Sequence, residues 1–313
     1  MSPPADEGGR RVIITGGTGL IGRAVAAELA GAGCQVVVLS RRPRPAQALG
    51  LPGGATVTGW DGHSAQGWDH LADGALAIVN LAGASLAGGR WTPERKRLIL
   101  DSRLQAGNAV LQAVQAAGRK PQVVIQASAV GYYGRRGDEE IGEEGPAGDD
   151  FLARVCVAWE ASTQAVAAMG TRHVVIRTGV VLSAAEGALP RLALPFRLFA
   201  GGRLGSGRQV LSWIHLADQA AAIRFLIEQP GAAGPFNLTA PQPVTNAEFS
   251  KLVGQVLRRP AWLPAPAFAL RLALGELATT VLDGQRVVPR RLLELGFRFR
   301  FPQVALALQD LLE

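Results

Sequence analysis

The chain alternates short, continuously apolar runs with longer segments whose apolar residues recur at helical spacing. The runs are rich in β-branched residues, as expected of strands that are buried on both faces. Regular alternation of strand and helix predicts right-handed crossovers and a parallel sheet. The predicted strands are Val12–Thr15, Gln35–Leu39, Thr56–Trp60, Leu76–Asn80, Val123–Ala127, Val174–Arg177 and Phe236–Leu238, and the predicted helices are Leu20–Ala32, Pro93–Ala117, Asp150–Ala168 and Leu216–Glu228.

This alternation breaks after Val181, where glycine and proline become frequent. A short helix is predicted near Leu192–Phe199 and another at Asn246–Leu257, followed by amphipathic pieces. We expect the two irregular stretches to form one small lobe that carries the substrate. The predicted division is a disordered tail at 1–10, a larger domain at 11–182 and 211–238, and the lobe at 183–210 and 239–313.

A glycine-rich turn, VIITGGTGLIG, joins the first predicted strand to the first predicted helix. In this context the first glycine permits a tight turn, the second lets the backbone approach a pyrophosphate, and the third lets the helix pack on the strand. The helix N-terminus adds free N–H groups for phosphates. A plain βα turn is the alternative. We predict an α/β fold, a Rossmann doubly wound parallel sheet with a small mixed C-terminal lobe. The phosphate-binding residues would be Gly16, Gly17, Thr18, Gly19, Leu20, Ile21 and Gly22.

The end of the second predicted strand indicates which dinucleotide binds. NAD sites carry a carboxylate there, which holds the ribose 2′-hydroxyl. This chain has Ser40, Arg41 and Arg42 instead. A guanidinium is a planar, permanently charged partner for a 2′-phosphate, which a carboxylate would repel. The sequence therefore favours NADP(H), although two solvated loop arginines are the alternative interpretation.

The net charge of +7 comes almost entirely from arginine. No lysine or arginine run exceeds three residues and no aromatic ladder accompanies the basic residues, so we do not expect nucleic-acid binding. Cys34 and Cys156 are far apart and provide neither a disulfide framework nor a metal-ligand spacing. The N-terminus has no apolar signal segment, and the apolar stretch 265–282 is interrupted by proline and charge. We expect a cytoplasmic protein with no membrane span.

Several motifs resemble the extended short-chain dehydrogenase/reductase superfamily: TGGTGLIG, NLAG at Asn80–Gly83, SAVGYYG at Ser128–Gly134, and SWIHLAD at Ser212–Asp218. More narrowly, SRLQAGNAVLQAV, WEAS, RTGVVLS and GQRVVPRRLLELGFRF resemble an atypical branch, the nucleoside-diphosphate-sugar-epimerase-like "epimerase family". The resemblance covers nearly the whole chain from Arg11.

That resemblance makes the absence of one motif informative. Active superfamily members use a Tyr-x-x-x-Lys pair on a helix, with the tyrosine as acid/base and the lysine lowering its pKa. Here the only tyrosines are Tyr132 and Tyr133, and neither has a lysine four residues later. Aligning Glu160 with the glutamate that commonly follows the motif puts Leu152 and Cys156 at the two positions. The helix is expected and the pair is missing.

The resemblance also implies further cofactor contacts. Asp61 ends the third predicted strand, where the superfamily often contacts adenine. Arg103 would contact a phosphate or a ribose, or else be a solvated helix arginine. The remaining implied contacts are Leu81, Ala82 and Gly83 along the cofactor path, and Gly179, Val180 and Val181 near the nicotinamide.

Two functions remain open from the sequence. The first is an NADP(H)-dependent oxidoreductase or epimerase that acts on an unknown small substrate with an unusual proton donor, for which the candidates are Tyr133, Ser128 and Glu160. The second is a non-catalytic NADP(H)-binding sensor or interaction protein on a reused fold. A polar cavity beside the nicotinamide would favour the first function. The sequence identifies neither the substrate nor the oligomeric state.

Overall fold

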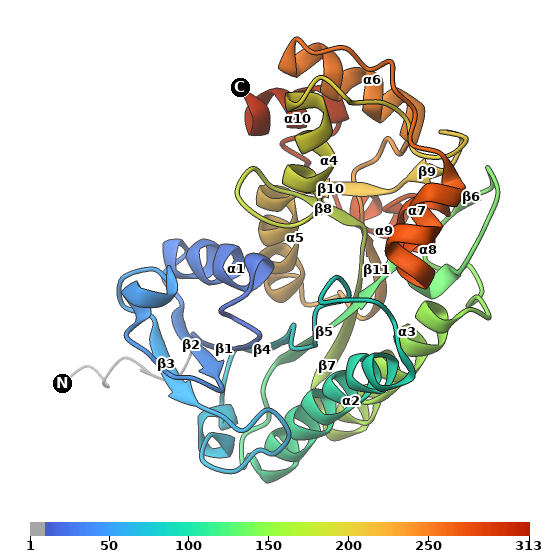
Figure 1. The fold of residues 1–313 in the computed structure, drawn as a ribbon. Helices are drawn as coiled ribbons and strands as arrows, with labels where there is room; N and C mark the ends of the chain where they lie inside the picture. Colours follow the sequence, from blue (N-terminus) through green and yellow to red (C-terminus); the bar gives the residue numbers. More distant parts are fainter. Residues whose placement is uncertain (1–9) are drawn as a thin grey trace.

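A seven-stranded parallel sheet forms the centre of the computed structural model, which describes residues 10–313 (Figure 1). The strands stand in the order β11-β7-β5-β4-β1-β2-β3. From β1 the chain adds β2 and β3 on one side, then returns to β1 and adds β4 and the remaining strands on its other side. This is the topology of a doubly wound sheet, and the predicted fold class is confirmed. The strands are β1 (Arg11–Thr15), β2 (Gln35–Ser40), β3 (Thr56–Gly59), β4 (Ala77–Asn80), β5 (Val123–Ala129), β7 (Arg172–Thr178) and β11 (Gly234–Leu238).

Helices cover both faces of this sheet (Figure 1). On β1, Val12 and Ile14 pack toward one face, in a cluster with residues of α1 (Leu20–Gly31) and α5 (Leu216–Glu228). Ile13, between them, packs on the opposite face with residues of α2 (Pro93–Ala116). Because strand side chains alternate and both faces are covered, most positions are apolar. This explains why the strands read as continuous apolar runs.

One predicted helix is shorter than expected. The segment predicted as a single helix, Asp150–Ala168, forms α3 (Phe151–Ala161) and then a short 3-10 helix, Gln164–Met169. Between them, the Thr163 hydroxyl bonds to the side chains of Gln126 on β5 (3.0 Å) and His173 on β7 (2.9 Å). These hydrogen bonds tie Thr163 to the sheet at a point where the helical spacing of apolar residues in the sequence predicts that the helix continues.

The C-terminal part of the chain builds a second cluster beyond the carboxyl ends of the strands. Phe196, Phe249 and Trp213 pack there with the C-terminal helix, and short β-pairs connect the segments. Residues 292 and 297 instead pack with the sheet core. The division into domain and lobe therefore stays a prediction. The elements of this region are α4 (Ala188–Arg197), α6 (Asn246–Leu257), α7 (Ala267–Leu274), α8 (Thr279–Leu282), α9 (Arg290–Glu294), α10 (Val304–Leu312), β6 (Glu140–Ile141), β8 (Val180–Leu182), β9 (Val210–Leu211), β10 (Trp213–His215), β12 (Val244–Thr245) and β13 (Arg286–Val287).

Except for Arg10, the predicted disordered tail at 1–10 lies outside the described residues. Within residues 10–313, no helix combines the length and apolar character needed to cross a membrane. The same residues contain no cluster of three or more His, Cys, Asp or Glu side chains placed to hold a metal ion.

Two glycines of α1 should respond in opposite ways to alanine. A Cβ on Gly22 would lie 2.5 Å from the Cα of Gly17, whereas a Cβ on Gly31 would meet nothing within 4 Å. We expect Gly22→Ala to lower the free energy of unfolding by about 1–3 kcal/mol through overpacking. Gly31→Ala should raise it by about 0.4–1 kcal/mol by restricting the unfolded chain. Urea unfolding measures both, and equal effects would contradict the close packing of α1 on the glycine turn.

Candidate cofactor site and adjoining cavity

The glycine turn between β1 and α1 is shaped by three separate constraints. Gly16 has φ +67°, and a Cβ there would lie 2.8 Å from the carbonyl carbon of Leu81. Gly22 allows α1 to pack against the turn itself. A Cβ on Gly19 would meet only the oxygen of Gly16, at 3.3 Å, so its other side is open. The open side at Gly19 is where the backbone can approach a ligand.

The N-terminus of α1 has backbone donors that no side chain caps. Its N-cap is Gly19, which makes no side-chain hydrogen bond, and its first turn carries no acidic residue. The first N–H groups of a helix lack intrahelical acceptors and attract anions. Arg23 reaches back to the carbonyl of Thr18 (2.6 Å) and pairs with Glu186 (2.7 Å), which ties the turn to the segment before α4. The arrangement fits a phosphate group.

A buried hydrogen-bond ladder fixes the neighbouring loop after β4. The Thr15 hydroxyl donates to Asn80 Oδ1 (2.6 Å) and accepts from the backbone N–H groups of Leu81 (3.1 Å) and Ala82 (3.2 Å). Asn80 Nδ2 donates in turn to Gln126 on β5 (2.9 Å). Thr15 and Gln126 are not among the predicted site residues, because their role depends on strands that are distant in the chain. The ladder holds the loop of Leu81–Gly83 against the glycine turn.

The end of β2 carries cations without partners. Arg41 and Arg42 are exposed, and neither forms an ion pair with any residue of the described range 10–313. Ser40 is buried and accepts from the N–H of Arg42 (3.2 Å). Asp61, after β3, accepts from the N–H groups of His63 and Ser64 at 2.8 Å each. Its carboxylate shapes this turn, and its contact with adenine stays a prediction.

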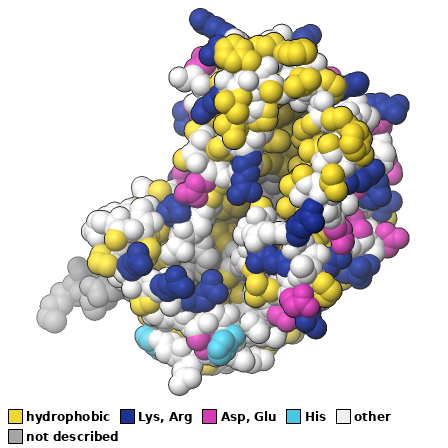
Figure 2. Space-filling model, viewed as in Figure 1, with side chains coloured by type: hydrophobic (Ala, Val, Ile, Leu, Met, Phe, Trp, Pro, Cys, Tyr) yellow, Lys and Arg dark blue, Asp and Glu magenta, His cyan; other side chains and the backbone are white. Residues whose placement is uncertain are grey.

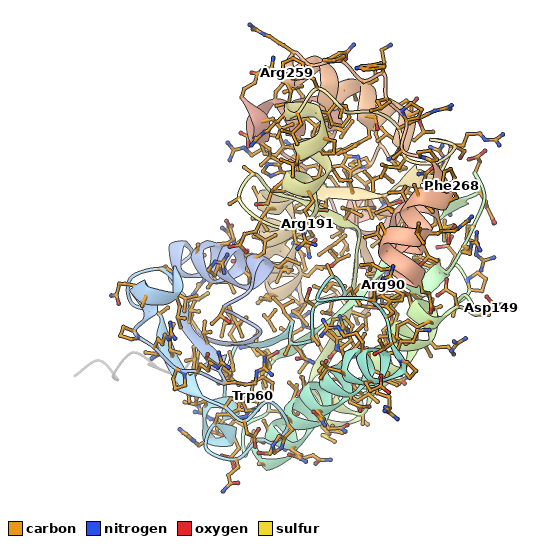
Figure 3. The ribbon with its side chains drawn as sticks, viewed as in Figure 1. Trp60, Arg90, Asp149, Arg191, Arg259 and Phe268 are labelled. Carbon is orange, nitrogen blue, oxygen red and sulfur yellow. The ribbon has the colours of Figure 1, made fainter. Side chains whose placement is uncertain are left out.

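A cavity of about 240 Å³ lies beyond the carboxyl ends of β5 and β7, against the C-terminal segments. The space-filling view shows a hollow between the sheet-bearing part and the upper helices (Figure 2), and Arg191 on α4 and Arg90 lie near this opening (Figure 3). Of the predicted contacts, Gly179 and Val180 line the cavity, while Val181 packs against the sheet core. The lining includes Leu86, Arg103, Val130, Gly131, Arg135, Asp150, Leu152, Val155, Cys156, Trp159, Thr178, Gly179, Val180, Ser212, Asp283 and Gln285.

The two positions assigned to the missing catalytic pair both face this cavity. Leu152 and Cys156 lie on α3 and belong to the lining. Leucine has no proton to transfer. Burial raises the pKa of the Cys156 thiol to about 11, so the sulfur is neutral near pH 7. The helix predicted to carry the pair is therefore in place, and neither of the two positions bears a tyrosine or a lysine.

Arg103 of α2 reaches the same cavity from beneath Gly83. A Cβ on Gly83 would lie 3.0 Å from the guanidinium carbon of Arg103. Its Nη1 donates to the carbonyls of Ala84 (3.1 Å) and Ile99 (2.8 Å), and its guanidinium stands over the ring of Trp159 (4.8 Å). Burial lowers the pKa of Arg103. The alternative of a solvated helix arginine is wrong, because the side chain is buried.

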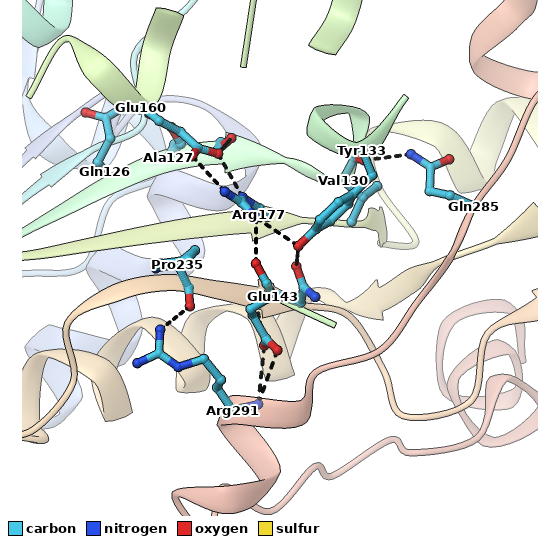
Figure 4. A network of polar contacts seen from close by, with 12 residues as sticks. Gln126, Ala127, Val130, Tyr133, Glu143, Glu160, Arg177, Pro235, Gln285 and Arg291 are labelled. Atoms are coloured by element: carbon cyan, nitrogen blue, oxygen red, sulfur yellow. Dashed lines mark hydrogen bonds and ion pairs between the residues drawn. The ribbon is translucent and has the colours of Figure 1, made fainter. Parts of the chain in front are cut away.

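Tyr133, the first candidate proton donor, lies in a buried polar network and not in the cavity lining (Figure 4). Its side chain is 0% exposed. Its hydroxyl donates to Asn237 Oδ1 (2.7 Å) and accepts from Arg177 Nη1 (3.1 Å). Burial, only partly offset by Arg177 and Asn237, raises the pKa of Tyr133 to about 12. The structure does not support Tyr133 as a proton donor.

The other two candidates are held by the same network. Arg177 forms a two-pronged ion pair with Glu160, through Nε (2.9 Å) and Nη2 (3.0 Å). The Ser128 hydroxyl donates to Glu160 (2.6 Å). The Glu160 carboxylate is thus occupied by a cation and a hydroxyl, and neither Glu160 nor Ser128 lines the cavity. Their arrangement fits a structural role that fixes α3 against β5 and β7.

Comparisons with known proteins agree with this geometry. The profile described as "NAD dependent epimerase/dehydratase family" matches residues 12–238, and one described as "Domain of unknown function (DUF1731)" matches residues 265–311. The chain is 40% identical over 302 residues to "Epimerase family protein YfhF" of Bacillus subtilis, covering 96% of this chain and 97% of that protein. It is 41% identical over 298 residues to "Epimerase family protein Mb2239" of Mycobacterium bovis, covering 95% and 96%.

A solved structure is also similar over nearly the whole chain. It is the human "epimerase family protein SDR39U1 (isoform2) with NADPH", at a TM-score of 0.86 and 35% identity. The match covers 96% of this chain and 98% of the human one. The similarity includes the C-terminal segments as well as the sheet.

Replacing Tyr133 tests its structural role. We expect Tyr133→Phe to lower the free energy of unfolding by about 1–3 kcal/mol near pH 7, because Arg177 and Asn237 lose a buried partner. The raised pKa means that the folded wild type holds the phenolic proton more tightly, so its stability falls as the pH rises from about 10 to about 12. The variant lacks this decline, and the difference between the proteins should shrink there. Urea unfolding at pH 8 and at alkaline pH measures it. A stable variant that loses ligand binding would contradict this role.

Proposed function

The chain belongs to the NAD dependent epimerase/dehydratase family, and we propose that it binds NADP(H) along the carboxyl edge of its sheet and acts on a small substrate in the adjoining cavity. The family membership confirms the resemblance to the atypical epimerase branch of the extended short-chain dehydrogenases/reductases. The observation that carries the proposal is the open glycine turn at an uncapped helix N-terminus. Such a turn leaves backbone donors and space for a pyrophosphate.

The residues proposed to hold the cofactor follow its length across the sheet edge. The glycine turn would bind the pyrophosphate, the loop after β4 would line the path, and the segment after β7 would border the nicotinamide. Bound NADP(H) supplies or accepts a hydride at the substrate. The proposed set is Gly16, Gly17, Thr18, Gly19, Leu20, Ile21, Gly22, Ser40, Arg41, Arg42, Asp61, Leu81, Ala82, Gly83, Arg103, Gly179, Val180 and Val181.

The phosphorylated cofactor is preferred for an electrostatic reason. Arg41 and Arg42 are exposed cations without ion-pair partners in the described part of the chain, at the strand end where a 2′-phosphate would lie. A guanidinium binds phosphate oxygens through charge-assisted hydrogen bonds. The similar human protein was crystallised with NADPH, which supports the same choice here.

The cavity supports a substrate-binding function over a purely sensory one. A non-catalytic NADP(H) binder needs no space beside the nicotinamide, and apolar side chains would fill such a space at no cost. Here a cavity of about 240 Å³ adjoins the segment proposed to border the nicotinamide, and arginine, cysteine and threonine residues are part of its lining. The cavity is small and partly polar, as a site for a small substrate should be.

The lining has no strong general acid or base of the usual kinds. Among residues 10–313, the cavity wall contains no tyrosine, lysine or histidine. Asp150 is engaged at the N-terminus of α3, where it accepts from the N–H of Ala153 (2.8 Å). Cys156, also on α3, bears a thiol that stays neutral because burial raises its pKa. The chain's own residues therefore bind and orient the substrate better than they move its proton.

Cofactor choice is the direct test. In calorimetric titrations we expect NADPH to bind more tightly than NADH, and Arg41→Ala to weaken NADPH binding by about 1.5–3 kcal/mol, the scale of a hydrogen bond to a charged group. NADH binding should hardly change. Arg119→Ala is the matched control, because this arginine is exposed and pairs with Asp73, remote from the proposed site. Equal affinity for the two cofactors would contradict the assignment.

Turnover should be slow. A positioned general acid contributes about 10²–10⁴-fold to carbonyl reduction. Because the described lining lacks the usual donor, we expect NADPH oxidation with aldehydes, ketones and sugar nucleotides to stay below the common range of about 1–10³ s⁻¹. Steady-state absorbance assays measure this rate. A substrate that is turned over within that range would show that an effective donor exists.

A further inference from the structure

More than half of the exposed large apolar side chains lie in two short segments of the C-terminal region. Residues 10–313 contain twelve such side chains, and seven of them lie within 194–199 and 262–272. Scattered single apolar residues are normal on a protein surface, whereas a cluster of them marks a contact site. The seven are Leu194, Leu198, Phe199, Trp262, Leu263, Phe268 and Leu272.

The fold brings these two segments side by side. The N–H of Leu263 donates to the carbonyl of Gly201 (3.0 Å), and the N–H of Ala265 donates to the carbonyl of Arg203 (2.9 Å). Residues 194–203 and 258–272 therefore share one surface, which we call the C-terminal patch. Figure 2 shows apolar side chains over the C-terminal helices, with arginine and lysine side chains among and around them.

Helix α7 contributes an uncovered apolar face to this patch. None of its eight residues is buried. Phe268 and Leu272 lie four positions apart, hence on one face of the helix, and they are 73% and 76% exposed. Folding of residues 10–313 therefore leaves this face open to another apolar environment.

Phe199 keeps its ring at the surface in spite of backbone strain. It follows the C-cap of α4 with φ +59°, at a position where glycine is usual and a bulky residue is an outlier. The guanidinium of Arg259 stands over its ring at 4.5 Å. Burial does not offset the strain, because the side chain is 57% exposed. Strained residues persist mainly at functional sites, so the exposed ring points to a contact that folding does not supply.

The charge of the patch is entirely positive. The sequence has no aspartate or glutamate from 187 to 217 or from 249 to 275. Of the acids that flank these stretches, Glu186 and Glu276 pair with other cations, and Asp218 and Glu248 accept backbone N–H groups. The arginines of the patch are exposed, and none forms an ion pair within residues 10–313. They are Arg197, Arg203, Arg258, Arg259 and Arg271.

A membrane surface with anionic lipids matches both properties of the patch. Apolar side chains enter the boundary between headgroups and acyl chains, while arginines remain at the headgroups and attract their phosphates. A second copy of the chain does not match, because a symmetric contact would set the positive patch against itself. Anchors between proteins usually sit in desolvated pockets. Trp262 and Phe268 instead project from the surface and do not line the cavity.

We propose that the C-terminal patch docks this protein on the surface of membranes that contain anionic lipids. The side chains of Leu198, Phe199, Trp262, Phe268 and Leu272 insert at the depth of the headgroups, and the five arginines bind lipid phosphates. Docking of this kind needs no spanning helix. It depends on the exposed C-terminal surface and not on a bound cofactor.

Trp262 is a built-in probe of the patch. It is 67% exposed, whereas the other five tryptophans of the chain are at most 9% exposed. Acrylamide should therefore quench its fluorescence in solution. Anionic vesicles should protect it from acrylamide, and lipids brominated in the acyl chain should quench it. Trp262→Phe should abolish both changes.

Binding of the full-length protein is measured by sedimentation with vesicles of phosphatidylcholine, alone or with about one third phosphatidylglycerol. We expect at least about tenfold tighter binding to the anionic vesicles at about 0.1 M salt, and most of this preference should be lost at about 0.5 M salt. Arg258→Gln with Arg259→Gln should weaken binding by about tenfold to thirtyfold. Phe268→Ser with Leu272→Ser should weaken it by at least about tenfold.

Phe199→Gly separates membrane binding from folding. Glycine relieves the strain at this position, so the variant should unfold near the wild-type temperature. Its affinity for anionic vesicles should nevertheless fall by about threefold to tenfold, because an inserting ring is lost.

Matched controls carry the same kinds of change outside the patch. Arg44→Gln with Arg119→Gln removes two exposed arginines, and Leu293→Ser with Leu295→Ser removes two exposed leucines at α9. Both double variants should bind the vesicles like wild type.

Four results would overturn the proposal. Equal binding to neutral and anionic vesicles would exclude lipid charge, and weakening by the arginine changes alone would exclude insertion. Shielding of Trp262 that increases with protein concentration without vesicles would assign the patch to a second copy. Absence of vesicle binding, with Trp262 shielded by an acidic amphipathic peptide, would assign it to a protein partner.

Discussion

The Arg177 guanidinium holds together the part of the molecule on which the cavity depends. It lies on β7, pairs through two nitrogens with Glu160 of α3, and donates to Tyr133 and to the carbonyl of Glu143. Its face also stacks on the ring of Tyr132, 3.4 Å from the ring centre. Removing one partner from such a buried pair leaves an uncompensated charge, so the elements must keep their relative positions. Through this one side chain, α3 is fixed at the carboxyl edge of the sheet.

The same edge is fixed on the cofactor side by neutral hydrogen bonds. The ladder from Thr15 through Asn80 to Gln126 runs across β1, β4 and β5 and positions the loop that borders the glycine turn. In a parallel sheet that is buried on both faces, polar side chains are tolerated where they have hydrogen-bond partners. Thr15 and Asn80 end their strands next to the loop that they orient, and Gln126 in the middle of β5 supports Asn80. The apolar interior makes the sheet rigid, and the polar side chains of the ladder position the loop at its carboxyl edge.

Between these two anchored regions lies the cavity. Leu152 and Cys156 face the cavity from the helix on which the resembled superfamily carries its tyrosine and lysine. The wall carries Arg103 on α2, with Trp159 beside it, and Arg135, which pairs with Asp283. The charge of Arg103 thus lies on α2, whereas the resembled superfamily carries its lysine on the helix that was matched to α3. For that reason, ligand recognition and proton transfer have to be considered separately in this protein.

The sequence alone determined what depends on neighbours along the chain. Strand and helix periodicity, the glycine turn and the basic residues after β2 are local features, and the α/β fold follows from them. Leu152 and Cys156 were also assigned by position alone. The tertiary structure decided the roles of polar side chains. Tyr133 bonds to Asn237, 104 residues away, and this buried partner makes it part of the framework, although its sequence context had suggested a donor. Arg103 and Trp159 could not be interpreted without burial, because whether a donor is satisfied depends on every segment that folds around it.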